Sequence, residues 1–239
     1  MKSLLVLLFG AGKFGKLLTT AGTMLLSVGA YALIFGWLYA VGFVALLFVH
    51  EMGHFIAARR RGLEVGAPTF IPFVGAWIAM KDMPRDAETE AYIGLAGPLV
   101  GTIGALICYA LGRMYDSNLL LAIAYAGFFL NLFNLIPLSP FDGGRITAAL
   151  SPKIWLLGVP MLVALFIYSP SPILILMAII AAPQVWKAWT FDKDAPENAA
   201  YYTVSAQDRL FYGFMYVALA GYLSLMATQV HDMLSHLRS

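Results

Sequence analysis

One group of residues has the types and the spacing needed to activate water on a metal ion. His50 and His54 lie four positions apart, which on a helix places both imidazoles on one face, where they can share a metal. Glu51 lies beside them and would act as a general base, taking a proton from metal-bound water and passing it to a leaving amine. A metal lowers the pKa of that water from about 15.7 toward 7, so the reaction could run at neutral pH.

A catalytic zinc site also needs a third protein ligand. The remaining histidines, His231 and His236, lie roughly 140° apart around a helix and do not share a face. Asp142 has a better setting, because prolines and glycines break the helix around it and let its side chain turn inward. Taken alone, Asp142 is better explained as an N-cap or turn residue before 146–150, paired with Arg145. Beside the histidine pair, the ligand role is favoured.

The elements that must position these residues are apolar. Of 239 residues, 61% are hydrophobic and only 12% are charged, about half the share of a soluble domain. Uncharged runs long enough to cross a bilayer as helix cover residues 17–50, 91–112, 117–141, 154–186 and 210–231. The sequence therefore predicts an all-α polytopic membrane protein with about six or seven transmembrane helices. Its net charge of +2, carried by few and scattered basic residues, gives nucleic-acid binding no support.

Three parts are expected along the chain. Residues 1–16 form an N-terminal interfacial segment, 17–150 a catalytic membrane core, and 151–239 additional C-terminal transmembrane helices with a polar connector at 187–209. The helices are expected at about 17–35, 37–60, 91–112, 118–138, at two places within 154–186 separated near 169–172, and at about 210–230. The spacing of Gly97, Gly101 and Gly104 predicts close helix packing.

Residues 64–90 do not fit a spanning helix. Prolines and glycines interrupt alternating and β-branched residues here, which predicts a short irregular loop or β-hairpin beside the active site. We expect this segment to offer strand-like pairing to an extended substrate.

The basic residues predict the orientation. Lys2, Lys13 and Lys16 precede the first helix, and Arg59–Arg61 end the second, so by the positive-inside rule both ends face the cytoplasm. The His50–His54 motif then lies within roughly 15 Å of the cytoplasmic end of its helix. We expect an integral protein of the cell (plasma or inner) membrane with its site nearer the cytoplasmic face.

Two motifs together resemble the site-2 protease family of intramembrane zinc metalloproteases. That family pairs a His-Glu-x-x-His helix with a distant Asn-x-x-Pro-x-x-x-x-Asp-Gly segment, which Asn134, Pro137 and Asp142-Gly143 match in spacing. The stretch Gly94–Pro98 is similar to the Ala-Gly-Pro stretch that members carry between the two motifs. The resemblance covers roughly residues 37–150.

The resemblance implies one zinc ion held by His50, His54 and Asp142, with Glu51 as the catalytic base. It also implies that Asn134 lies near the substrate and polarises the scissile carbonyl or the oxyanion. The activity implied is hydrolysis of peptide bonds within or near transmembrane segments of membrane-protein substrates in the lipid bilayer, as in regulated intramembrane proteolysis. The chain resembles the short members, since the 64–90 loop has no room for a PDZ module and no regulatory domain is recognisable.

Two other functions compete with this interpretation. A non-enzymatic metal-binding or metal-transport protein should carry ionisable residues along several spans, whereas here they concentrate at one site. A degenerate protease that binds without cutting is disfavoured because all the residues that the chemistry requires are present. No feature of the sequence sets the natural substrate or the oligomeric state.

Overall fold

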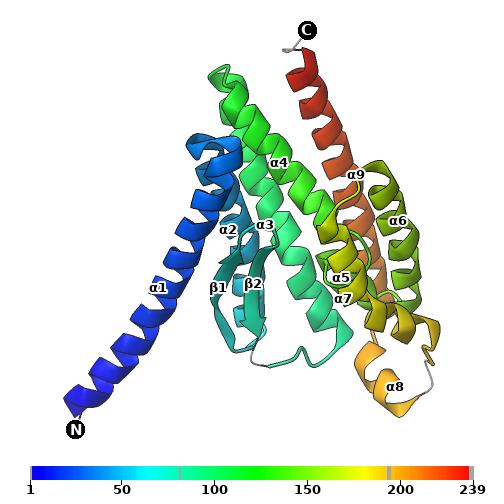
Figure 1. Ribbon diagram of the computed structural model, residues 1–239. Coiled ribbons are helices and arrows are strands. Elements are labelled where there is room, and N and C mark those ends of the chain that lie inside the picture. The colour runs from blue at the N-terminus through cyan, green and yellow to red at the C-terminus, as the bar shows by residue number, and fades with distance from the viewer. Residues whose placement is uncertain (1, 81, 193–194, 237–239) are drawn as a thin grey trace.

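The computed structural model describes residues 2–80, 82–192 and 195–236, which form a helical protein with one small sheet (Figure 1). Five of its helices are long and apolar enough to cross a membrane: α1 (Lys2–Phe35), α2 (Trp37–Arg60), α3 (Ala87–Met114), α7 (Pro172–Trp189) and α9 (Ala206–His236). Two shorter apolar stretches are α4 (Asn118–Asn134) and Pro152–Tyr168, in which the 3₁₀ helix η1 (Pro152–Leu157) leads into α6 (Gly158–Tyr168). The prediction of a polytopic helical membrane protein is confirmed.

Glycine and proline set the helix boundaries. Gly36 has a φ of 84°, which glycine adopts without strain, so the chain reverses between α1 and α2. The expected break near residues 169–172 separates α6 from α7. α4 ends at Asn134 and not near 138 as expected, because the ring of Pro137 disfavours helical backbone at the residue before it. α1 runs unbroken from Lys2, so the interfacial placement of residues 1–16 stays a prediction, and Met1 lies outside the described residues.

The 64–90 segment contains a β-hairpin. Strand β1 (Val65–Ile71) pairs antiparallel with β2 (Gly75–Met80), with Phe70 opposite Ala76 and Pro68 opposite Ile78. In Figure 1 the hairpin lies between α1 and the α2–α3 pair. The prediction of a short hairpin or loop beside the motif helix is confirmed.

The glycine stripe of α3 makes room for functional side chains. An added Cβ at Gly97 would lie 2.2 Å from His54 Nε2, and one at Gly101 would lie 2.3 Å from Asn131 Oδ1. At Gly104 the nearest atom, on Leu46, would lie at 3.0 Å. The predicted close packing is present, and at two of the three positions the space is filled by polar groups of the site.

The C-terminal part packs back on these helices. α5 (Asp142–Ala148) contacts α3, and α9 packs along α4, as Figure 1 shows. The short helix α8 (Pro196–Tyr202) lies in the connector before α9. At the end of α2, Arg61 donates two hydrogen bonds of 2.7 Å to Glu88, which also accepts one of 2.6 Å from the Tyr212 hydroxyl. This carboxylate joins α2, α3 and α9.

Candidate metal centre and active site

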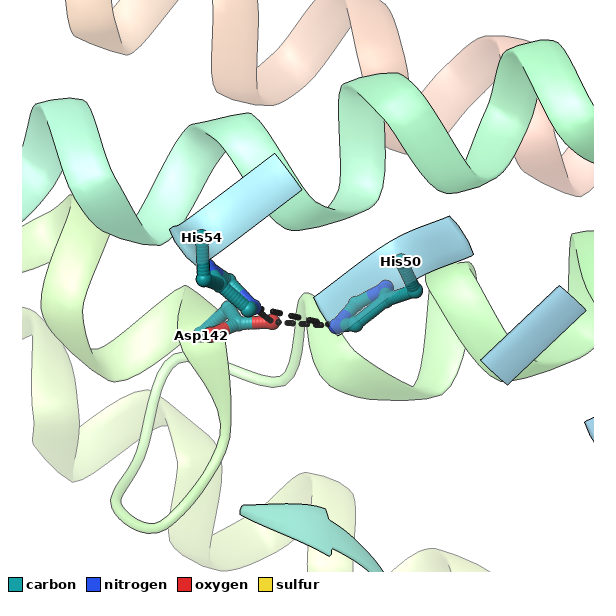
Figure 2. A group of neighbouring side chains, drawn as sticks. All are labelled: His50, His54 and Asp142. Atoms are coloured by element: carbon teal, nitrogen blue, oxygen red, sulfur yellow. Dashed lines mark hydrogen bonds and ion pairs between the residues drawn. The ribbon is translucent and has the colours of Figure 1, made fainter. Parts of the chain in front are cut away.

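The motif residues lie on the buried face of α2. His50, Glu51 and His54 are 2%, 7% and 7% exposed. The two Nε2 atoms lie 3.1 Å apart, so the spacing of four residues brings both imidazoles to one point (Figure 2). A pair of imidazole nitrogens inside an apolar protein is expensive to bury without a partner, which makes this a functional site by default.

Asp142 completes the group. Its Oδ2 lies 3.2 Å from His50 Nε2 and 3.1 Å from His54 Nε2 (Figure 2). Asp142 is the first residue of α5 and follows a loop that Gly143 packs tightly, since a Cβ there would lie 2.2 Å from the Leu135 carbonyl oxygen. Arg145 also approaches its Oδ1 at 3.8 Å, so the alternative partner considered above contacts the other carboxylate oxygen.

The tautomers of both histidines follow from their partners. His50 Nδ1 lies 2.8 Å from Asn131 Oδ1, while Asn131 Nδ2 donates to the Gly127 carbonyl at 2.7 Å. Because that bond fixes the orientation of the amide, His50 Nδ1 must carry the proton. His54 Nδ1 lies 2.8 Å from the Ile93 carbonyl oxygen and must carry its proton, because a carbonyl oxygen only accepts.

This arrangement fits a divalent metal. With Nδ1 protonated on both rings, the two Nε2 lone pairs and the Asp142 carboxylate converge, and their donor atoms lie within 4.8 Å of one another. Such a convergence is repulsive unless a metal ion or a proton lies among the donors. Tetrahedral zinc, with bonds of about 2.1 Å, would separate its ligand atoms by about 3.4 Å, close to the 3.1–3.2 Å found here.

The three donors open onto a large cavity. It has a volume of about 1040 Å³ and is lined by α1, α2, the hairpin, α3, α4, α5 and α7. Glu51 lines this cavity beside the histidines. Asn134 lines it too, and its Nδ2 donates to the Leu130 carbonyl at 2.9 Å. The structure therefore brings all five predicted site residues around one space.

Two further polar residues support the site and were not identified from the sequence. Asn131 is 1% exposed and orients His50. Gln184 of α7 accepts a hydrogen bond through Oε1 from the backbone N–H of Ser139, in the loop before Asp142. Their signal was present, since an amide inside an apolar span is a functional candidate. The histidines of α9 lie outside the metal group, and the His231 ring packs 5.6 Å from Tyr125.

Known proteins share the part of the chain that carries the histidine motif. Residues 38–117 match the sequence profile of peptidase family M50. Zinc metalloprotease MJ0392 of Methanocaldococcus jannaschii is 33% identical over 134 residues, which is 54% of this chain and 38% of that protein. The Mycobacterium tuberculosis protein Rip3 is 32% identical over 136 residues, covering 52% of this chain and 34% of its own length. The chain thus spans well under half the length of these relatives.

A solved structure is also similar. The site-2 protease from Methanocaldococcus jannaschii aligns with a TM-score of 0.47 and 24% identity, over 70% of this chain and 84% of that one. The matched family segment contains α2 with His50, Glu51 and His54, and α3 with the Ile93 carbonyl that orients His54. The resemblance expected from the two motifs is confirmed over this segment, which matches peptidase family M50, and the relatives named above include a zinc metalloprotease.

Proposed function

We propose that this protein is an intramembrane zinc endopeptidase that hydrolyses peptide bonds within or near transmembrane segments of membrane proteins. The observation that carries the proposal is the convergence of two Nε2 lone pairs and the buried Asp142 carboxylate beside Glu51, on the wall of a cavity of about 1040 Å³ among apolar helices. The similarity to zinc metalloproteases supports the same function.

The roles follow from the donor set. His50, His54 and Asp142 would hold one zinc ion, with Asn131 and the Ile93 carbonyl fixing the tautomers of the two histidines. Zinc bound there would supply Lewis acidity and make water a usable nucleophile near neutral pH. Glu51 takes the proton from the attacking water and delivers it to the leaving amine nitrogen. This proton transfer requires a carboxylate that faces the same cavity, and Glu51 does so.

Asn134 has a separate role. Its Nδ2 already donates one hydrogen bond within α4, but an amide nitrogen has a second N–H to offer. Because the side chain lines the cavity, that N–H can stabilise negative charge developing on the carbonyl oxygen of the scissile peptide. We propose this oxyanion-stabilising role for Asn134.

The hairpin would receive the substrate in extended form. In an antiparallel ladder, residues of alternate pairs point their backbone groups outward. The Phe70 N–H points away from β2, toward Thr23. The backbone groups of its partner Ala76, and those of Ile78 two residues further along β2, therefore point away from β1. Both residues line the cavity, and the edge of β2 can therefore pair with a peptide there.

A proline at Ala76 tests the pairing directly. It removes one outward N–H and leaves the ladder with β1 intact, because proline is tolerated at a strand edge. Cleavage should fall in Ala76→Pro while the bound zinc remains at the wild-type level. Unchanged kinetics in this variant would rule out pairing along β2.

The finer membrane assignments are part of the same proposal. His54 lies six residues before Arg60, or about 9 Å along the axis of α2, and the basic residues there favour the cytoplasm. We propose the cell (plasma or inner) membrane, with the site nearer the cytoplasmic face. We also propose that residues 17–150 form the catalytic core, that 151–239 support it, and that 1–16 lie at the interface.

The decisive experiment compares wild type with Glu51→Gln. Both proteins are purified in detergent, their zinc content is measured, and each is incubated with a reporter transmembrane substrate whose products are identified by mass. The expected result is cleavage by wild type alone, with zinc retained in Glu51→Gln. Glu64→Gln is the matched control, because it changes an exposed glutamate near the end of the same helix.

The other outcomes separate the alternatives. Zinc binding without cleavage of any substrate in a panel would favour a metal-binding or transport role. Absence of zinc from the wild-type protein would refute the ligand assignment itself.

A further inference from the structure

One face of α1 carries a row of hydroxyl side chains beside the hairpin. Thr20, Thr23, Ser27 and Tyr31 follow one another at spacings of three, four and four residues, which keeps them on a single face of the helix. β1 packs against α1, as Figure 1 shows. We refer to these four residues as the α1 hydroxyl stripe.

Three of the four hydroxyls bond the backbone of the hairpin. Thr20 Oγ1 donates to the Pro68 carbonyl at 2.7 Å, and Thr23 Oγ1 accepts from Phe70 N–H at 3.2 Å. Both backbone groups point outward from β1, where a third strand would otherwise meet them. The stripe therefore occupies the outer edge of β1 and leaves the outer edge of β2 as the one that faces the cavity.

The tip of the hairpin is fixed by the same stripe. Phe73 has a φ of 64°, a left-handed conformation that strains a bulky side chain and persists only where its surroundings enforce it. Tyr31 supplies that enforcement, because its hydroxyl accepts from Phe73 N–H at 3.1 Å and its ring packs edge-on at 5.0 Å. Tyr31 and Phe73 both line the cavity that contains Glu51.

We infer that the α1 hydroxyl stripe positions the substrate by holding the hairpin in register with the metal ligands. The inference rests on the proposed peptidase function. A strand advances about 3.3 Å per residue, so a slip of one residue would carry the scissile carbonyl away from Glu51 and turn its side chains to the opposite face. Thr20, Thr23 and Tyr31 are positioning residues in this account, since they act on the substrate through the hairpin.

The chain offers matched controls for each hydroxyl. Thr23→Val and Tyr31→Phe each remove one acceptor of a hairpin N–H and keep the shape of the side chain. Ser27→Ala removes a hydroxyl of the same stripe whose Oγ is buried and has no hydrogen-bond partner among the described residues. Tyr168→Phe removes the hydroxyl of an exposed tyrosine at the end of α6, which does not line the cavity.

Two measurements on full-length protein test the inference. Hydrogen exchange of the 65–80 segment should be about fivefold faster at Phe70 in Thr23→Val and at Phe73 in Tyr31→Phe, the effect of losing one neutral hydrogen bond. Both variants should keep their zinc, cleave the reporter more slowly, and yield additional products displaced by one or two residues. Ser27→Ala and Tyr168→Phe should match wild type in exchange, rate and product masses.

The product masses separate positioning from general stability, because a merely loosened fold slows cleavage without moving the cut. Unchanged exchange in Thr23→Val and Tyr31→Phe would show that the stripe does not hold the hairpin. Faster exchange with wild-type rate and cut position would show that holding it does not position the substrate. If wild type cleaves no reporter, the proposed peptidase function fails, while the exchange data still decide whether the stripe holds the hairpin.

Discussion

The helices that carry the metal site and those that flank its cavity are packed very differently. In α2 and α3, half of the most apolar 18-residue window is buried inside the protein, whereas in α1 and α7 the share is 17%. The first pair holds both histidines and the carbonyl that orients one of them. The second pair contributes side chains to the cavity wall. Metal chemistry needs ligands fixed within about half an ångström, while substrate entry needs helices around the cavity that can move.

The kind of contact differs as well. Around the metal site, glycines bring backbones so close that a single methyl group would strike a functional atom, as at Gly97 and Gly101. Along α1, by contrast, an added methyl at Gly22 or Gly29 would meet nothing within 4 Å. We therefore expect glycine to be required at Gly97 and Gly101 beside the metal site, and to be replaceable at Gly22 and Gly29 of α1.

The largest effect we expect comes from Gly97→Ala. The new Cβ would lie 2.2 Å from His54 Nε2, so His54 must leave the metal site and zinc binding and cleavage should both be lost. Gly29→Ala on α1 is the control and should bind zinc and cleave as wild type does. Zinc content by atomic emission measures the difference, and a full complement of zinc in Gly97→Ala would show that the core yields more than its packing implies.

Asn131→Ala should come next in size. Without the amide oxygen, His50 loses the partner that fixes its tautomer, and loss of such a partner lowers metal affinity about 10–100-fold. Asn134→Ala, three residues along the same helix, should keep its zinc and lose cleavage. Competition with a chelator reports the affinity of each variant. Equal affinities in the two variants would place Asn131 outside the metal site.

The contrast between the two regions also explains what the sequence could reveal. His50, Glu51 and His54 were identified because a fixed spacing on one helix places them together whatever the rest of the fold does. Asp142 was identified because helix-breaking residues surround it and because the spacing from Asn134 matches a family motif. The polytopic helical architecture followed from length and hydropathy alone, since a bilayer requires roughly 20 apolar residues per helix.

Contacts between distant segments could not be read in this way. Asn131 reaches His50 across 81 positions, and no local motif marks it in the way that the spacing to Pro137 marks Asn134. The stripe from Thr20 to Tyr31 looks like part of an ordinary membrane helix until β1 is seen beside it. The end of α4 was predicted a few residues too late because apolar side chains continue past Asn134, although Pro137 already stops the helix.

Gln184 gives a smaller effect and sharpens the comparison, because it joins a lightly packed helix to the metal site. Its Oε1 accepts from Ser139 N–H in the loop before Asp142. Gln184→Met keeps the length of the side chain but removes the acceptor, and we expect zinc affinity to fall about fivefold. Ile179→Met, on an exposed position of α7, is the control. If both variants bind zinc equally, α7 and the ligand loop are independent.

Tyr201→Phe should give the smallest effect, on stability alone. The Tyr201 hydroxyl donates to Glu90 Oε2 at 2.5 Å and ties α8 to the start of α3. Its loss should reduce the free energy of unfolding by about 1 kcal/mol, with zinc content unchanged. Tyr168→Phe, on a residue that is 89% exposed, should have no effect.

The pH dependence of this difference identifies its origin. Burial, together with the nearby Glu90 carboxylate, raises the pKa of Tyr201 above its ordinary value near 10. A group whose pKa is raised in the folded state contributes its full stabilisation at pH values below its unfolded-state pKa. That stabilisation is lost as the pH rises through the folded-state pKa. The gap in unfolding midpoint between wild type and Tyr201→Phe should therefore stay constant from about pH 6 to 9 and shrink only in stronger alkali. A gap that already closes near neutral pH would assign the effect to another group and leave α8 without its proposed tie to α3.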